Sequence, residues 1–297
     1  TANTINPYLV DAPNVLITNR RAPISANVPR MFYGSMPIDN GHLILSADER
    51  QAVISAYPAA HDWIREYVGG YEFINRQMRY CLWLDGISPR DLRSVPPIME
   101  RIERTRNYRL SSGRPQTRSA ADSPAMFGEV RQPDTPYLLL PKVSSQTRMY
   151  MPIGFYGPEV IASGSALIVP GASPFDFGLL QSAIHMDWMR AVGGRLKGDY
   201  QYSAGIIYNN FPWPCGVSDA QREEIEALAQ AVLDARERYP DSSLADLYDP
   251  LTMPPDLTKA HQALDRAVDR LYRKKPFASD KERLELLFER YRTLTSV

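Results

Sequence analysis

The middle of the chain decides its fold, starting with Tyr137-Leu138-Leu139-Leu140-Pro141-Lys142 and continuing as Val143-Ser144-Ser145-Gln146-Thr147-Arg148. An apolar run of this length, closed by proline, is typical of a buried strand, and the polar residues behind it predict a loop. Ala166-Leu167-Ile168-Val169 predicts a second strand, and residues 177–191 predict a helix. The core is therefore expected to mix strands with helices.

The same mixture extends toward the N-terminus. Ser46 has an acidic residue three positions later, a pairing that caps the start of a helix. Residues 79–84 are aromatic and apolar and predict a buried strand. A helix is expected from Pro96 to about Arg109, followed by a turn or mobile loop at residues 111–116.

After Pro214 the pattern changes to helices only. Capping signatures at Ser218 and Ser279, and a proline pair at residues 254–255, each precede apolar residues at helical spacing. We therefore expect three helices in this part of the chain.

The predicted fold class is α+β, with three parts along the chain. Residues 1–30 form an extended lead-in with four prolines and one short expected strand, and lack a core of their own. We expect them to be the tail of an upstream domain. Residues 31–214 are expected to form a mixed α/β domain, and residues 215–297 a small all-α helical domain, with the boundary near Cys215. The short strand of the lead-in is expected at residues 14–18.

Charge is balanced over the whole chain but distributed unevenly. The sequence has 34 basic and 34 acidic residues. Residues 218–297 carry 13 basic and 16 acidic side chains, whereas residues 76–118 carry ten arginines against four acids. A local excess on a neutral chain favours a confined anion-binding face over general coating of a polyanion. A solvated helix face beside a flexible loop explains the excess equally well, so charge alone leaves both open.

Several kinds of chemistry lack their residues in this sequence. It has no Gly-x-x-x-x-Gly-Lys-Ser/Thr loop, and none of its six lysines has the Asp/Glu-x-Lys spacing of metal-dependent nucleases. Its four histidines lie outside zinc-ligand patterns. His261, one turn before Asp265, shares an apolar stripe and is expected to be packed; Cys81 is expected in the core. No metal site or catalytic centre is predicted.

Cysteine content and the length of the apolar runs indicate the cellular environment. Two cysteines are too few for a disulfide framework, which favours a reducing, cytoplasmic environment. No apolar run approaches the ~20 residues that a membrane helix needs. We therefore expect no membrane partner.

Two segments imitate the Asn/Asp/Ser-Pro-Pro-aromatic loop with which amino-methylating DNA methyltransferases hold a flipped base. Asn6-Pro7-Tyr8 has a single proline, and Asn210-Phe211-Pro212-Trp213 has Phe where the first proline belongs. Neither follows a Gly-rich cofactor loop. We interpret both as structural, and the second as a hinge into the helical domain.

Eight ordered segments give the sequence a specific resemblance. They are Ile5-Asn6-Pro7-Tyr8-Leu9-Val10-Asp11, Phe32-Tyr33-Gly34-Ser35-Met36-Pro37, Tyr80-Cys81-Leu82-Trp83-Leu84, Phe127-Gly128-Glu129-Val130-Arg131-Gln132-Pro133, Pro141-Lys142-Val143-Ser144-Ser145, His185-Met186-Asp187-Trp188-Met189-Arg190-Ala191-Val192, Tyr208-Asn209-Asn210-Phe211-Pro212-Trp213-Pro214 and Ser242-Ser243-Leu244-Ala245-Asp246-Leu247-Tyr248-Asp249-Pro250. The chain resembles the C-terminal half of the MmeI-like DNA methyltransferases, the type IIL restriction–modification family.

The resemblance implies sequence-specific binding of double-stranded DNA by a target-recognition domain, followed by a helical C-terminal domain. It also implies an upstream methyltransferase domain that transfers a methyl group from S-adenosylmethionine to adenine N6. The cofactor and catalytic loops of that domain are missing from this sequence, so we expect recognition without catalysis. Two alternatives stay open: a protein–protein scaffold without DNA contact, and a fragment that retains methyl transfer.

The resemblance also points to DNA-contacting residues. It assigns base reading to Gln146 and Arg148, whose side chains can grip adenine and guanine edges bidentately. Family members often have an acid at the position of Gln146, so the recognised sequence does not transfer. Further contact candidates are polar or basic residues in three loops and one helix: Arg106, Arg109, Arg114, Arg118, Ser144, Ser145, Arg195 and Lys197.

Overall fold

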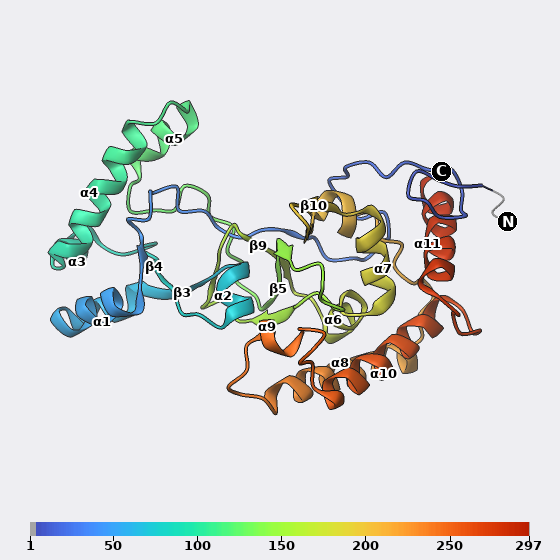
Figure 1. Ribbon diagram of the computed structural model, residues 1–297. Helices are drawn as coiled ribbons and strands as arrows, with labels where there is room; N and C mark the ends of the chain where they lie inside the picture. Colours follow the sequence, from blue (N-terminus) through green and yellow to red (C-terminus); the bar gives the residue numbers. More distant parts are fainter. Residues whose placement is uncertain (1–3, 297) are drawn as a thin grey trace.

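The computed structural model describes residues 4–296. It shows one lobe built mostly from residues of the first half of the chain, a central region of sheets, and the C-terminal helices wrapped along the opposite side (Figure 1). The lead-in runs from the C-terminal helices back to the sheets (Figure 1). The observed class, mixed sheets followed by an all-helical region, confirms the predicted α+β fold.

The central sheet forms because its inner strands are apolar on both faces. All five residues of β5 (Tyr137–Pro141) are buried, and β9 (Ala166–Pro170) pairs with it antiparallel along its whole length. The edge strands are β1 (Phe32–Tyr33), beside β9, and β7 (Gly154–Tyr156), beside β5. The two strands predicted from apolar runs are thus confirmed.

The lobe has its own sheet and its own core. The sheet has the order β2 (Ile44–Leu45), β4 (Tyr80–Leu82), β3 (Ile64–Val68) and β8 (Ile161–Ala162), and only the β3–β8 pairing is parallel. Its helices are α1 (Ala47–Ala56), α3 (Pro89–Arg93), α4 (Pro96–Leu110) and α5 (Pro115–Ser119), with 3₁₀ turns at Pro58–Trp63 and Ala120–Asp122. The short helix α2 (Gly70–Asn75) follows β3 and packs on β5 of the central sheet (Figure 1). Cys81 lies in this core, as predicted, fully buried.

The third sheet is small and exposed along one edge. The hairpin strands β10 (Gly194–Leu196) and β11 (Asp199–Gln201) pair antiparallel, and β11 pairs with β6 (Val143–Ser144). Because β6 follows β5 almost directly, this sheet carries the polar loop behind the central strand.

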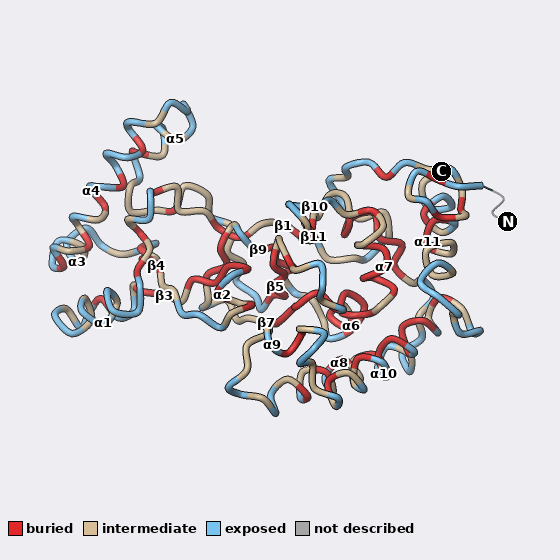
Figure 2. Tube along the Cα trace, in the orientation of Figure 1, coloured by how far each residue is buried: buried red, intermediate tan, exposed pale blue. Residues whose placement is uncertain are grey.

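The C-terminal helices share one core with the central sheet and the lead-in. They are α8 (Asp219–Glu237), α9 (Leu244–Leu247), α10 (Pro255–Tyr272) and α11 (Asp280–Thr295). They pack against α6 (Pro174–Leu180) and α7 (Ala183–Val192), which precede a π turn at Ala204–Tyr208. Figure 2 shows the buried face of α8 and α10 turned toward one another and toward the sheets. This core extends from Val10 to Tyr291, so the helices are packed into the molecule along their apolar stripes.

Some predictions of local structure were wrong. Between Pro214 and Ser296 the chain forms four helices instead of three, because Ser243 caps the short helix α9 through the amide of Asp246. Helix α5 begins at Pro115, inside the turn or loop expected at residues 111–116.

Residues 177–191 form parts of two helices. At the junction the Gln181 side chain donates to the carbonyl of Met151 and the Ser182 hydroxyl donates to the carbonyl of Leu179. Residues 14–18 form no strand: the amide of Ile17 donates to the Tyr8 hydroxyl, and Val15 and Ile17 pack onto the main core without a strand neighbour.

Candidate nucleic-acid interface

The register of the small sheet brings two predicted regions together. Ser144 of β6 lies opposite Tyr200 of β11, which places residues 145–150, called here the 145–150 loop, against the β10–β11 turn. The amide of Gln146 donates to a carboxylate oxygen of Asp199 at 3.3 Å. A Cβ added at Gly198 would meet the side-chain Nε2 of Gln146 at 3.3 Å, so the glycine lets the Gln146 side chain lie against the turn.

The turn presents two exposed cations. Lys197 stands at its tip with a left-handed φ of 60°. Arg195 is exposed as well, and its guanidinium carbon lies 3.9 Å from the ring centroid of Tyr200, which is itself buried. The stacking holds the Arg195 guanidinium over the ring, while the edge of the guanidinium remains open to solvent.

Arg148 lies half-buried at the other side of the loop. One terminal nitrogen donates to the Ser144 hydroxyl at 3.2 Å, and its Nε is shielded from solvent without a hydrogen-bond partner among residues 4–296. Burial lowers the pKa of Arg148, opposed by Asp199 and Asp249, and the group remains a cation. The Arg148 side chain lines a hollow of about 460 Å³ shared with Tyr71. This side chain therefore borders a space that a ligand could enter.

The structure corrects the assignment of Ser144. Its side chain is 2% exposed and its hydroxyl accepts the hydrogen bond from Arg148. Ser144 thus orients the neighbouring arginine and is not itself a contact residue in this conformation. Ser145 is half-exposed and bonds to the Thr147 hydroxyl at 2.9 Å, within the loop.

The predicted arginines of the helical segment lie in the other lobe, on α4, α5 and the turn between them, called here the α4–α5 arm. Arg106, Arg114 and Arg118 are exposed, and Arg118 donates to the carbonyl of Ser112 at 2.8 Å. The ten predicted contact residues therefore fall into two groups, one on the small sheet and one on the arm (Figure 1).

Arg109 was wrongly predicted as a DNA contact. It is fully buried, and its guanidinium donates to five backbone carbonyls, those of Pro37, Ile38, Ala120, Ser123 and Met126. Burial lowers its pKa. The residue ties the arm to the loop at residues 37–38, and its donors are all used inside the protein.

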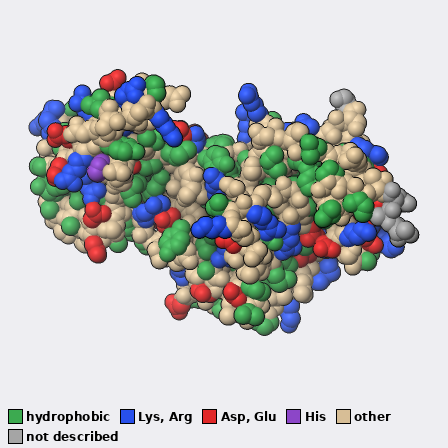
Figure 3. All heavy atoms as spheres, turned by 45° about the horizontal axis from the view of Figure 1, so that its top comes forward, with side chains coloured by type: hydrophobic (Ala, Val, Ile, Leu, Met, Phe, Trp, Pro, Cys, Tyr) green, Lys and Arg blue, Asp and Glu red, His purple; other side chains and the backbone are tan. Residues whose placement is uncertain are grey.

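Part of the basic excess at residues 76–118 is also used internally. Arg79 pairs with Glu72, and two more ion pairs join Arg101 to Glu49 and Arg104 to Glu100. On the face drawn in Figure 3, Lys and Arg stand in separate groups with acidic side chains between them. This pattern fits local anion contacts better than a continuous polyanion track.

Comparisons with known proteins match this architecture from end to end. Family models match residues 11–215 as "MmeI, target recognition domain" and residues 217–297 as "MmeI, C-terminal domain". The chain belongs to the MmeI family. It is 40% identical over 293 residues to "DNA methyltransferase A" of Bacillus subtilis (strain 168), which covers 99% of this chain and 33% of that protein. The chain thus spans about a third of the length of that curated relative.

A solved structure of the family is similar throughout the chain. The Type IIL restriction-modification enzyme MmeI, solved in complex with DNA, superimposes with a TM-score of 0.94 at 44% identity. The match covers all of this chain and 39% of that one. Both the fold and the resemblance predicted from sequence are therefore confirmed.

Both imitations of a catalytic loop in this MmeI-family chain are structural, as predicted. The Asn210 side-chain amide donates to the carbonyls of Thr18, Gly205 and Ile206, and the residue is fully buried. The Asn6 side-chain oxygen accepts from two backbone amides of its own turn. Asn210 thus holds the lead-in against the core, and Asn6 holds the shape of the turn at residues 6–10.

His261 is packed as predicted. Its Nε2 lies 2.9 Å from the Tyr248 hydroxyl, its ring stacks on Tyr150, and burial lowers its pKa far below the usual range. Within residues 4–296 no group of three or more His, Cys, Asp or Glu could hold a metal ion. Among the described helices, none is both long and apolar enough to cross a bilayer.

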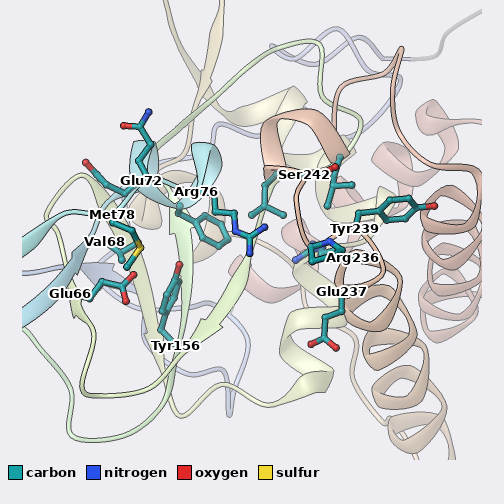
Figure 4. Close-up of a pocket in the computed structure, with 15 residues that line it drawn as sticks. Glu66, Val68, Glu72, Arg76, Met78, Tyr156, Arg236, Glu237, Tyr239 and Ser242 are labelled. Carbon is teal, nitrogen blue, oxygen red and sulfur yellow. The ribbon is translucent and has the colours of Figure 1, made fainter. Parts of the chain in front are cut away.

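A second hollow, of about 390 Å³, separates α2 from the end of α8 (Figure 4). It is lined by the acids Glu66 and Glu237 as well as by Arg236, whose guanidinium is already bonded to Tyr248, Ile153 and Gln181. Mixed charge of this kind does not suit a phosphate backbone. We therefore assign no DNA contact to it.

Sequence reasoning missed three residues at the interface. Lys142 lines the hollow beside Arg148, Asp199 holds the Gln146 amide, and Arg190 of α7 reaches the 145–150 loop. Lys142 lies directly between the predicted strand and the polar loop, and this position could have identified it as a candidate contact residue. Asp199 and Arg190 depend on tertiary packing, which their local sequence does not reveal.

Proposed function

We propose that this chain recognises a specific sequence in double-stranded DNA, as the target-recognition portion of a DNA methyltransferase of a restriction–modification system. The observation that carries the proposal is the pairing of β6 with β11. It sets Gln146 and Arg148 beside the exposed cations Arg195 and Lys197 on one surface. Family membership supports the same function.

Recognition divides between base edges and phosphates. Gln146 is exposed beside the turn and can pair with adenine N6 and N7, and Arg148 can pair with guanine O6 and N7 from its hollow. Arg195 and Lys197 supply positive charge at the turn, where they hold phosphates and set the register. Lys142 adds a third cation next to Arg148.

The α4–α5 arm supplies a second set of contacts. Arg106, Arg114 and Arg118 project from the other lobe. Contacts between these side chains and phosphates extend the interface along the duplex. Arg109 contributes by fixing the arm in place.

Methyl transfer belongs to the longer protein in this proposal. The relatives are about three times as long as this chain, and S-adenosylmethionine and the adenine-N6 chemistry are assigned to the part that it does not span. The residues here do not fit the cofactor: the Gly69-Gly70 pair that follows β3 has the space beside Gly69 filled by Ser165 and Glu72. The upstream methyltransferase domain is then the chain's intramolecular partner.

Binding to random duplex DNA, followed by fluorescence anisotropy at about 50 and 200 mM salt, tests the proposal. We expect binding at low salt that weakens by orders of magnitude at high salt, because each neutralised phosphate releases counterions. Failure to bind at low salt would favour the alternative, a protein–protein scaffold.

A further inference from the structure

The 145–150 loop is held differently at its two ends. Its beginning continues from the β6–β11 pairing. Its end has no strand partner, and two side chains from helices hold it instead. Arg190 of α7 donates to the carbonyl of Met149 at 3.1 Å and to that of Arg148 at 3.5 Å. The hydroxyl of Tyr150 donates to Asp265 of α10 at 2.6 Å.

Arg190 is in turn linked to the C-terminal helices through Asp187. Asp187, one turn earlier on α7, lies 3.4 Å from Arg190 and 3.1 Å from Arg283 of α11. Arg283 also binds Asp269 of α10 at 2.8 Å. Asp187 is 5% exposed, so this row of alternating charges, called here the ion-pair ladder, is shielded from solvent at its centre.

The Tyr150 anchor joins the same helices. Its ring stacks on His261 of α10, with centroids 3.9 Å apart. The second oxygen of Asp265 accepts the amide of Ala183, the first residue of α7, at 2.7 Å. A shift of α10 or α11 against α7 would therefore move both anchors of the loop, because they are parts of one connected network.

We propose that the C-terminal helices take part in choosing the DNA sequence, because the ion-pair ladder and the Tyr150–Asp265 bond set the position of Arg148. Asp187, Arg190 and Asp265 are positioning residues, and Arg148 is the group that touches the base. This proposal rests on the proposed function. It assigns to the helical domain a part in specificity beyond packing.

Two other roles for these residues make different predictions. Arg190 is about one-third exposed and could bind a phosphate itself; its loss would then weaken all duplexes alike and reduce the salt slope by about one. A purely structural ladder would lower the melting temperature and leave base preference unchanged. Asp187 separates these roles well, since a buried carboxylate cannot bind phosphate.

The test uses the full chain and two duplexes: the one that the wild type selects, and the same duplex with the base pair read by Arg148 exchanged. The ratio of their Kd values is measured for wild type, D187N, R190Q and Y150F. We expect the ratio to fall by roughly 2- to 30-fold in each variant, with an unchanged salt slope. R270Q is the matched control, because Arg270 forms an exposed interhelical ion pair with Glu224 away from the loop, and it should keep the wild-type ratio.

An unchanged ratio in folded D187N and Y150F would overturn the inference, as would a uniform loss of affinity with a lower salt slope in R190Q. Y150F keeps the ring stacked on His261 and loses only the hydroxyl, so it serves even where D187N does not fold. If the wild type itself shows no preference between duplexes, the proposed function fails instead, and the two failures are distinguishable.

Discussion

At the scale of single residues, burial separates arginines that the sequence presents as equivalent. Arg106 and Arg109 lie three positions apart on α4, and both fit a basic helix face. Only the fold shows that Arg109 points inward, where the loop at residues 37–38 and the segment at residues 120–126 offer their carbonyls. These acceptors come from distant parts of the chain, so no local pattern could reveal them.

Replacing Arg109 by Met should destabilise the protein by at least about 3 kcal/mol, because several buried carbonyls lose their donor. The matched variant R106M, on the exposed side of the same helix, should change stability by less than about 0.5 kcal/mol. Denaturant unfolding of both variants measures the difference. Equal effects would show that Arg109 is not the tie that we describe.

Asp265 should make stability depend on pH in an unusual direction. Burial raises the pKa of Asp265 to about 6, opposed by the Tyr150 hydroxyl, the Ala183 amide and Arg283, and supported by Asp269. The folded state therefore binds this proton more tightly than the unfolded state, so the contribution of Asp265 is greatest at low pH and declines as pH rises through about 4 to 6. The loss is on the order of 3 kcal/mol.

The variant D265N removes this titration. Relative to wild type, the stability of D265N should increase by roughly 2–3 kcal/mol between pH 4 and pH 7, because only the wild type loses the contribution of Asp265. Chemical denaturation of both proteins at the two pH values measures the change. A difference that stays constant with pH would contradict the account of Asp265.

At the scale of elements, sequence patterns predicted those whose signals are local. The apolar runs of β5 and β9 and the capping residues Ser46, Ser218 and Ser279 identified their strands and helices. The break between α6 and α7 was not predicted. Ser182 bonds to a carbonyl of the preceding turn, but Gln181 bonds to the carbonyl of Met151, which is distant in sequence. The hairpin β10–β11 was expected only as a basic loop, since its strands are three residues long.

The β10–β11 turn should contribute affinity without sequence preference. K197N removes the charge and uses a residue that tolerates the left-handed backbone of this position, so the turn keeps its shape. Affinity for all duplexes should fall together and the salt slope should drop by about one. Anisotropy titrations at several salt concentrations measure both. Loss of preference at a single base pair would instead make Lys197 a base reader.

At the scale of the whole molecule, the chain presents basic groups on two lobes with separate cores. If one duplex contacts both, the triple variant R106Q/R114Q/R118Q should lower the salt slope by up to about three, without changing which sequence is selected. These side chains are exposed, so the fold should be unaffected. An unchanged slope would confine the interface to the small sheet.

The central claim is that Arg148 reads a base within a specific duplex site. The most direct measurement is selection from a randomised duplex library by the wild type and by R148A, followed by sequencing. We expect the wild type to enrich one motif and R148A to lose the preference at a single base pair, a loss worth roughly 1–3 kcal/mol, with the rest of the motif retained. A wild type that enriches no motif, or an R148A protein that enriches the same motif at every position, would contradict the account.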